Sequence, residues 1–172
     1  MSKRQKCPLR AEAGVDSKRA SATLLGMERA VHVRPATSAH YQFALELYLL
    51  TMRSYTEELM VWDEAQQRDS FAALWKLTEV SVVTVNGEDV GWLQVNERPT
   101  EVRLLQFFIA PVHQRRGIGT EILGNLVAAW KTTARPVRLT VLKNNPARQL
   151  YERAGFSVVG EIGVKFEMKL KA

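Results

Sequence analysis

A short segment, residues 114–120, places two arginines and two glycines between an apolar run and a helical pattern. The first N–H groups of a helix have no intrahelical partner, and the helix dipole favours an anion beside them. Glycine lets such a ligand approach the backbone without a Cβ in the way. We therefore interpret the segment as an anion site suited to a pyrophosphate, formed by Gln114, Arg115, Arg116, Gly117, Ile118, Gly119 and Thr120.

Two familiar phosphate motifs fit this segment poorly. A Walker A loop requires Gly-Lys-Ser/Thr, whereas the chain has Gly119 and Thr120 with no lysine between them. A dinucleotide fingerprint requires a third glycine where Ile122 stands. A plain flexible turn without a ligand is the remaining alternative.

The flanking patterns predict the elements that must position this segment. Strands are expected over 30–35, on both sides of the Asn86-Gly87 turn, over 102–110, over 136–142 and over 162–170. The strand before the segment is apolar at nearly every position from Leu104 to Ala110, which indicates burial on both faces. Helices are expected over 38–54 with an apolar face of Phe43, Leu47 and Leu50, from Asp63 onward with Phe71, Leu74 and Trp75, over 118–130, and over 146–154.

These elements predict one mixed α/β domain, with a central twisted mixed sheet flanked by about four helices. With "QRRGIG" at 114–119 and "NNPARQLYERAGF" at 144–156, the chain resembles the GNAT superfamily of N-acetyltransferases. The resemblance extends over roughly residues 30–170 and implies a GNAT-like acyl-CoA N-acyltransferase fold over 28–172.

The resemblance implies acetyl-CoA as co-substrate and no metal. It assigns the pyrophosphate to the backbone N–H groups of residues 115–120, and the pantetheine arm to the strand residues Phe107, Phe108 and Ile109 and to Asn144. It implies that Tyr151 donates a proton to the departing thiolate. Transfer would occur directly, in a ternary complex with a primary amine of a small molecule or peptide. The alternative is a non-catalytic acyl-CoA sensor of the same fold.

The acceptor side is expected in residues 53–67, which are rich in acidic and aromatic residues. Glu57 and Glu58 are the candidates for a general base or amine ligand, because an amine attacks only after losing a proton. Arg53, Tyr55, Trp62 and Gln106 are the candidates for substrate binding. His113 is read as a turn residue beside the site, not as a base.

The charge distribution and the cysteine content bear on the binding partners and on the cellular compartment. Residues 1–26 hold six basic and two acidic side chains, and the rest of the chain carries only +2 of the +6 total. We expect residues 1–27 to be a disordered basic tail and expect neither nucleic-acid nor membrane partners. A single cysteine, Cys7, and the absence of a secretory signal favour the cytoplasm and exclude an internal disulfide framework. The fold would also allow a homodimer through a terminal strand.

Overall fold

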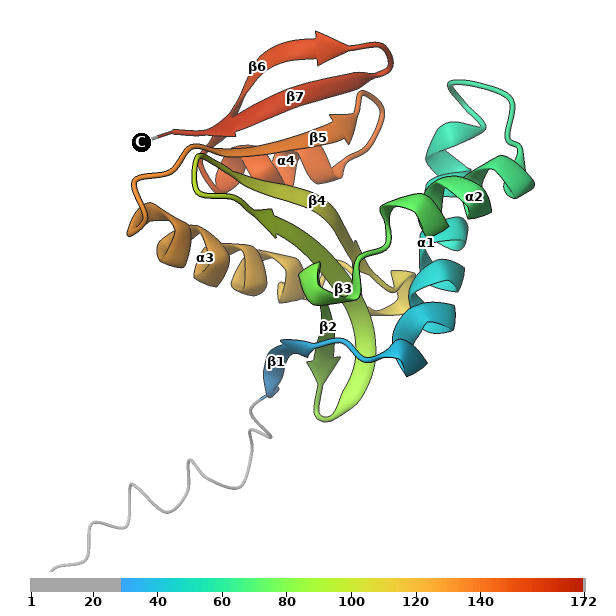
Figure 1. Ribbon diagram of the computed structural model, residues 1–172, viewed down its shortest axis with the longest axis horizontal. Coiled ribbons are helices and arrows are strands. Elements are labelled where there is room, and N and C mark those ends of the chain that lie inside the picture. Colours follow the sequence, from blue (N-terminus) through green and yellow to red (C-terminus); the bar gives the residue numbers. More distant parts are fainter. Residues whose placement is uncertain (1–28, 172) are drawn as a thin grey trace, which may run out of the picture.

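A computed structural model describes residues 29–171 and shows a single seven-stranded sheet in the order β1-β2-β3-β4-β5-β7-β6 (Figure 1). The predicted tail and Cys7 lie outside these described residues. In chain order the main elements are β1 (Val31–Pro35), α1 (Tyr41–Thr56), α2 (Glu64–Leu74), β2 (Val80–Val85), β3 (Glu88–Glu97), β4 (Val102–Ile109), α3 (Ile118–Lys131), β5 (Val137–Leu142), α4 (Ala147–Arg153), β6 (Phe156–Ile162) and β7 (Lys165–Leu170).

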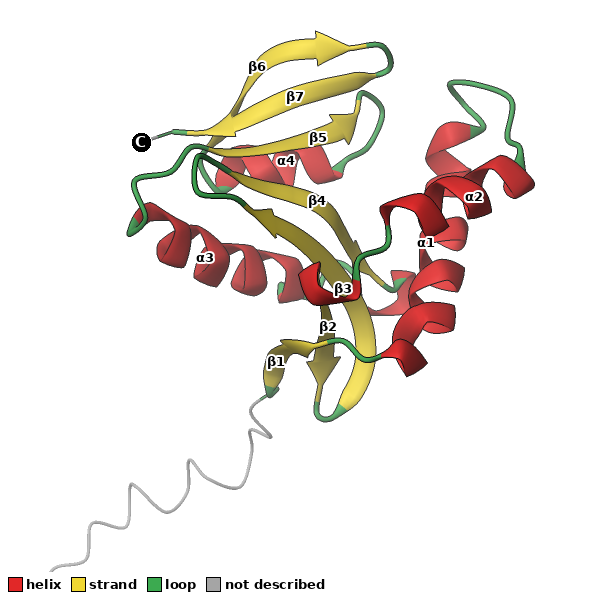
Figure 2. Ribbon diagram, in the orientation of Figure 1, coloured by secondary structure: helices red, strands yellow, loops and turns green. Residues whose placement is uncertain are grey.

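Helices cover both faces of this sheet (Figure 2). Trp92 of β3 packs with residues of α1 and α2, whereas its neighbour Leu93 packs with Ile118 and Ile122 of α3. Successive side chains of a strand point to opposite faces, so α1 and α2 lie on one face and α3 on the other. The mixed α/β fold expected from the sequence is confirmed.

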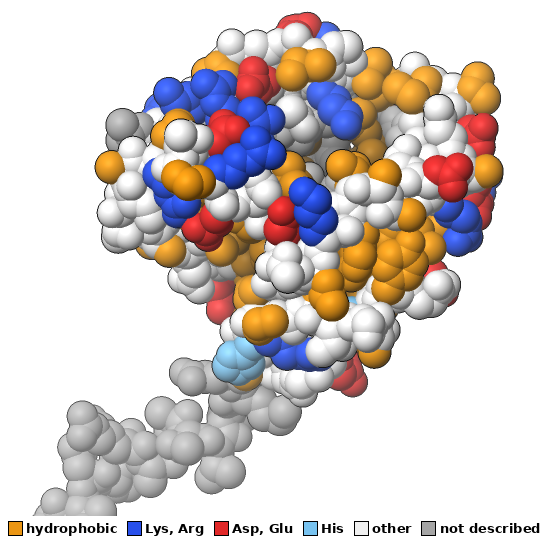
Figure 3. Space-filling model, in the orientation of Figure 1, with side chains coloured by type: hydrophobic (Ala, Val, Ile, Leu, Met, Phe, Trp, Pro, Cys, Tyr) orange, Lys and Arg blue, Asp and Glu red, His pale blue; other side chains and the backbone are white. Residues whose placement is uncertain are grey.

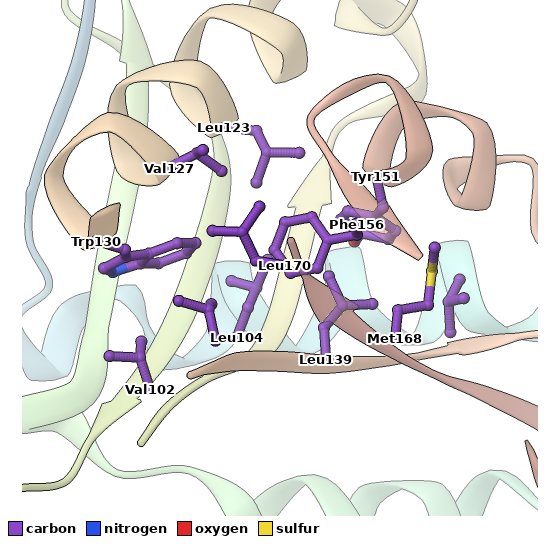
Figure 4. Close-up of a cluster of buried hydrophobic side chains, with 12 residues drawn as sticks. Val102, Leu104, Leu123, Val127, Trp130, Leu139, Tyr151, Phe156, Met168 and Leu170 are labelled. Carbon is purple, nitrogen blue, oxygen red and sulfur yellow. The ribbon is translucent and has the colours of Figure 1, made fainter. Parts of the chain in front are cut away.

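The largest buried cluster joins α3 and α4 to the strands beneath them (Figure 4). Leu123, Val127 and Trp130 recur at helical spacing along α3, and all three are buried. They meet strand residues such as Leu139 and Met168. This packing fixes the two helices whose first turns face the gap described below.

Local turn chemistry ends β2 and α4 where the sequence predicts, but the region of the strand expected over 162–170 holds two strands, β6 and β7. Asn86 and Gly87 adopt φ of 51° and 90°, the left-handed values that a tight β2–β3 hairpin needs. Gly155 takes φ of 99° directly after α4, as expected for a helix C-terminus. The terminal strand region is divided at Gly163 into β6 and β7, which pair as a hairpin.

The apolar face of α1 is not the one predicted. Leu47 is buried, but Leu50 is 63% exposed. The helix instead buries a neighbouring stripe that includes Ala44, Leu45 and Tyr48. Likewise α2 buries Phe71 but leaves Leu74 half exposed. Both departures come from how the helices dock on the sheet, since Tyr48 and Phe71 both join the aromatic cluster around Trp92 and Phe108.

A bulge in β4 opens the sheet. Gln106 pairs with Gln94 and Leu104 pairs with Val95, which leaves Leu105 as an extra residue. The parallel pairing of β4 with β5 stops at Leu104, after only three residue pairs. The prediction that β4 is buried on both faces from Leu104 onward is therefore wrong at Leu105, which is 38% exposed, because no strand covers it beyond this point.

Within residues 29–171, no helix combines the length and the apolar character that crossing a bilayer requires.

Candidate active site

A cavity of about 700 Å³ lies where β4 and β5 separate. Its walls come from α1 and α2 on one side, and from the segment before α3, the first turns of α3, and α4 on the other. Figure 3 shows the surface hollowed between the β5–β7 region and α1–α2, with Lys and Arg side chains gathered on the former side. Parallel strands that separate leave unpaired backbone groups, so this gap is the natural position for a ligand.

The arginine- and glycine-containing segment forms one end of the cavity. Arg115 and Gly117 take positive φ values of 59° and 80°, and α3 begins at Ile118. Arg29 braces this turn from outside, since its guanidinium donates to the Arg116 carbonyl oxygen and pairs with Glu121 at 3.0 Å. The turn thus presents the first N–H groups of α3 beside the cavity, where they favour an anion.

The backbone of β4 supplies hydrogen-bonding groups along the gap. Ala110 N–H donates to the Val90 carbonyl at 2.8 Å, so the pair that they form is hydrogen-bonded. In an antiparallel ladder, hydrogen-bonded residue pairs alternate with pairs that exchange no hydrogen bond. The next pair, Gly91–Ile109, is therefore of the second kind, and its backbone N–H and C=O groups point away from each other. By this alternation the backbone groups of Phe107 and Ile109 face the gap, whereas those of Phe108 face β3. Gln114 Nε2 already donates to the Ile109 carbonyl at 2.8 Å.

Tyr151 lies on α4 and lines the same cavity. Its side chain packs edge-on against Phe156 and is 7% exposed. Burial raises the pKa of the Tyr151 phenol to about 12, because the interior disfavours the phenolate. The hydroxyl therefore stays protonated at neutral pH, as a proton donor must.

Most predicted residues meet at this cavity. Its lining contains Tyr55, Gln106, Phe107, Phe108, Ile109, Gln114, Arg115, Gly117, Ile118, Gly119, Thr120 and Tyr151. His113 also lines it. Six further predicted residues, Arg53, Glu57, Glu58, Trp62, Arg116 and Asn144, are not among the lining residues.

Two of these outlying residues make a link between segments. Asn144 Nδ2 donates to the Tyr55 carbonyl at 2.9 Å and to Glu58 Oε2 at 2.8 Å. Asn144 thus ties the loop after α1 to the segment after β5. Glu57 instead pairs with Arg53 at 2.6 Å, one helical turn earlier.

The wall formed by α1 and α2 contains residues that the sequence analysis missed: Tyr48, Thr51, Met52, Thr56, Met60, Gln67, Ser70 and Leu74. Tyr48 donates to Gln67 Oε1 at 2.7 Å, which joins the two helices across the wall. The spacing Tyr48, Thr51 or Met52, Tyr55 follows one helical face. This spacing could be read from the sequence, but these residues adjoin the more apolar face that was predicted to be buried, so they were not assigned to the site.

The charged groups at the cavity are all basic. Among the described lining residues there is no aspartate or glutamate, whereas Arg115, Arg153 and Lys165 are present. Across residues 29–171, no group of three or more His, Cys, Asp or Glu side chains is arranged to hold a metal ion. The cavity therefore suits an anionic ligand, and its other contacts are hydroxyl, amide and apolar.

Comparisons with known proteins give a consistent result. Residues 76–158 match the family model of the acetyltransferase (GNAT) domain. No curated protein matches the sequence. A similar solved structure is the PaiA N-acetyltransferase from Thermoplasma acidophilum in complex with coenzyme A, which is 16% identical, with a TM-score of 0.72 over 83% of this chain and 99% of that chain.

Two further structures share the fold at lower scores. Arabidopsis thaliana Naa50, in complex with the bisubstrate analogue CoA-Ac-MVNAL, is 14% identical, with a TM-score of 0.59 over 83% of this chain and 99% of that one. The ribosomal-protein-S18-alanine N-acetyltransferase from Escherichia coli is 18% identical, with a TM-score of 0.58 over 82% and 93%. At these identities the likeness establishes the fold.

Proposed function

Residues 76–158 match the GNAT acetyltransferase domain, and on that premise we propose that the chain is a GNAT acetyltransferase that transfers the acetyl group of acetyl-CoA to a primary amine. One observation carries the proposal: the anion-binding turn, the unpaired backbone of β4 and the buried phenol of Tyr151 all line one cavity. A long donor with a pyrophosphate at one end and a thioester at the other matches this arrangement.

Each part of the cavity has a role toward such a donor. The N–H groups of residues 115–120, ahead of and within the first turn of α3, hold the pyrophosphate. Phe107 and Ile109 offer backbone groups to the amides of the pantetheine arm, in the manner of a missing strand. Gly117 permits the left-handed turn that aims the N–H groups at the donor.

Bound acetyl-CoA supplies an acetyl thioester, and the chain supplies the polar groups around it. The backbone N–H of Ile109 stabilises the negative charge that develops on the thioester oxygen. As the new C–N bond forms and the C–S bond breaks, Tyr151 donates its proton to the leaving sulfur and regains one from solvent.

The acceptor amine must lose a proton to react. Glu57 and Glu58 do not line the cavity, so we assign neither the role of a base in direct contact with the amine. Arg115, Arg153 and Lys165 place positive charge at the cavity, which disfavours an ammonium and lowers the pKa of a bound amine. Water in the open cavity then accepts the proton.

The test begins with the donor. Titration calorimetry should show acetyl-CoA binding, and a failure to bind at millimolar donor would contradict the proposal. Tyr151→Phe should lower kcat by roughly 10²-fold, the scale of general acid catalysis, with donor affinity nearly unchanged. Tyr41→Phe removes a phenol of the aromatic cluster outside the cavity and should leave kcat unchanged. Donor binding without transfer to any amine would favour an acyl-CoA sensor instead.

A further inference from the structure

The two walls of the cavity differ in chemistry, and the difference bears on the acceptor. The donor wall, around the start of α3, is accounted for by the proposed function. The opposite wall comes from α1, α2 and the loop between them. Its lining residues include Tyr48, Met52, Tyr55, Met60 and Gln67, all of them uncharged at neutral pH.

The wall is not uncharged because α1, α2 and the loop between them lack carboxylates. Six carboxylates lie in or between these helices, and none of them is among the lining residues: Glu46, Glu57, Glu58, Asp63, Glu64 and Asp69. Five of them are bonded elsewhere: Glu46 accepts from Gln42 at 2.7 Å, Glu64 pairs with Arg68 at 2.7 Å, and Asp63 accepts from the Gln66 N–H at 3.0 Å. Glu57 is paired with Arg53, and Glu58 with Asn144. The acidic residues of this region thus lie outside the lining of the acceptor wall.

A second ammonium on the acceptor would have no counter-ion there. The ionisable residues that line the described cavity are basic or aromatic, including Arg153 and Lys165. A charge removed from water without a partner is costly, and like charges nearby add to the cost. A neutral hydrocarbon chain would instead contact the Met52 and Met60 thioethers and the Tyr48 and Tyr55 rings, surfaces that adapt to apolar shapes.

We infer that the acceptor is a monoamine with a neutral, largely apolar body, and that amines with a second positive charge near the first are rejected. This inference rests on the proposed function, because it identifies the acceptor of the same transfer. The uncharged wall formed by α1 and α2 is the element that selects it.

A matched pair of amines tests the inference. Hexylamine and 1,5-diaminopentane have chains of equal length and differ only in a terminal methyl or ammonium group. With the full chain and saturating acetyl-CoA at one pH, kcat/KM should be at least about tenfold higher for hexylamine, given the cost of burying an unpaired charge. The readout is free coenzyme A together with mass spectrometry of the acetylated amine.

A charge placed on the wall should reverse the preference. Gln67→Glu adds a carboxylate and keeps the oxygen that accepts from Tyr48, so the ratio of hexylamine to 1,5-diaminopentane should fall by at least about tenfold. Ser70→Asp adds the same charge from another position of α2 that lines the cavity and serves as a second variant. Gln66→Glu makes the same exchange at an exposed residue outside the lining and should leave the ratio unchanged.

The outcomes are distinct. Equal or better use of 1,5-diaminopentane by the unaltered protein would overturn the inference and leave the transferase proposal standing. An unchanged ratio in both Gln67→Glu and Ser70→Asp would also overturn it. Acetylation of neither amine would overturn it as well, and the acetyl-CoA titration and the Tyr151→Phe comparison would then decide the proposed function separately.

Discussion

At the scale of single residues, Tyr151 combines a reactive position with deep burial. The residue lines the cavity and is 7% exposed, and burial raises the pKa of its phenol to about 12. An unfolded tyrosine ionises near pH 10. The burial that keeps the hydroxyl protonated therefore also makes the free energy of unfolding depend on pH in the alkaline range.

We expect the free energy of unfolding to fall with pH in the range between these two pKa values. Below pH 10 Tyr151 is protonated in both states and contributes no slope. Between about pH 10 and 12 only the unfolded state loses the proton, so stability should drop by about 1.4 kcal/mol per pH unit from this group. Urea unfolding at pH 9, 10 and 11 measures the slope, and Tyr151→Phe should reduce it by that amount. An equal slope in both proteins would show that the phenol is not buried.

The second residue-scale prediction separates two roles for Glu58. Its carboxylate accepts from Asn144 and so holds the loop after α1 near the cavity without lining it. If Glu58 only positions the loop, Glu58→Gln should retain this hydrogen bond and most of kcat. Asn144→Ala removes both of its bonds, to Tyr55 and to Glu58, and should raise the acceptor KM by about tenfold, with little change in acetyl-CoA affinity.

Steady-state kinetics with each substrate varied in turn would test this assignment. A Glu58→Gln protein with kcat reduced more than a hundredfold, and with a changed pH profile, would instead support the general-base role predicted from the sequence.

At the scale of elements, Gly91 determines how closely β3 approaches β4. A Cβ at this position would lie 2.3 Å from the Phe108 carbonyl oxygen and 2.8 Å from a side-chain carbon of Ile109. The Ile109 side chain could rotate away, but the contact with the Phe108 carbonyl cannot be relieved without moving the backbone of β3 or β4. The strand that offers its backbone to the donor is therefore held in place by a glycine on its neighbour, a residue outside the motif predicted from the sequence.

Gly91→Ala should destabilise the fold by about 1–3 kcal/mol, as overpacked positions do, and should weaken acetyl-CoA binding. Gly124→Ala is the matched control. Gly124 lies on the exposed side of α3 with no atom within 4 Å of an added Cβ, so this change should stabilise the protein by about 1 kcal/mol through helix propensity. Denaturant unfolding and calorimetry measure both effects. A Gly91→Ala protein with unaltered stability would contradict the close packing of β3 on β4.

The same elements explain what could be read from the sequence. Asn86-Gly87 and Gly155 act through local backbone preferences, so the hairpin turn and the helix end that they mark were predicted correctly. The exposure of Leu105 was not predictable in that way, because it follows from a bulge and from the point where β5 stops pairing. Apart from Tyr151, the donor side of the site lies in one continuous segment, residues 107–120, whereas the acceptor wall depends on how α1 and α2 dock.

At the scale of the whole molecule, the gap between β4 and β5 makes a prediction about dynamics. Beyond Leu104 the two strands no longer pair, so amides of Phe107 and Ile109 have no partner strand on that side. Acetyl-CoA bound there should slow hydrogen exchange in residues 105–109 and in the first turn of α3, while β1 and β6 at the sheet edges change little. Exchange measured with and without donor checks this, and uniform protection across the sheet would contradict binding in the gap.

The short pairing of β4 with β5, only three residue pairs long, also separates the strands into two groups that are continuous in sequence. All of β1–β4 precedes α3, and all of β5–β7 follows it. Two pieces separated within residues 132–136 would each contain contiguous strands. They would meet along this narrow joint, through the side chains of α3, and through the hydrogen bonds of Asn144 to Tyr55 and Glu58. A ligand that spans the gap would contact both pieces and stabilise their complex. The fraction of the split protein that reassembles would therefore increase with the concentration of its own donor.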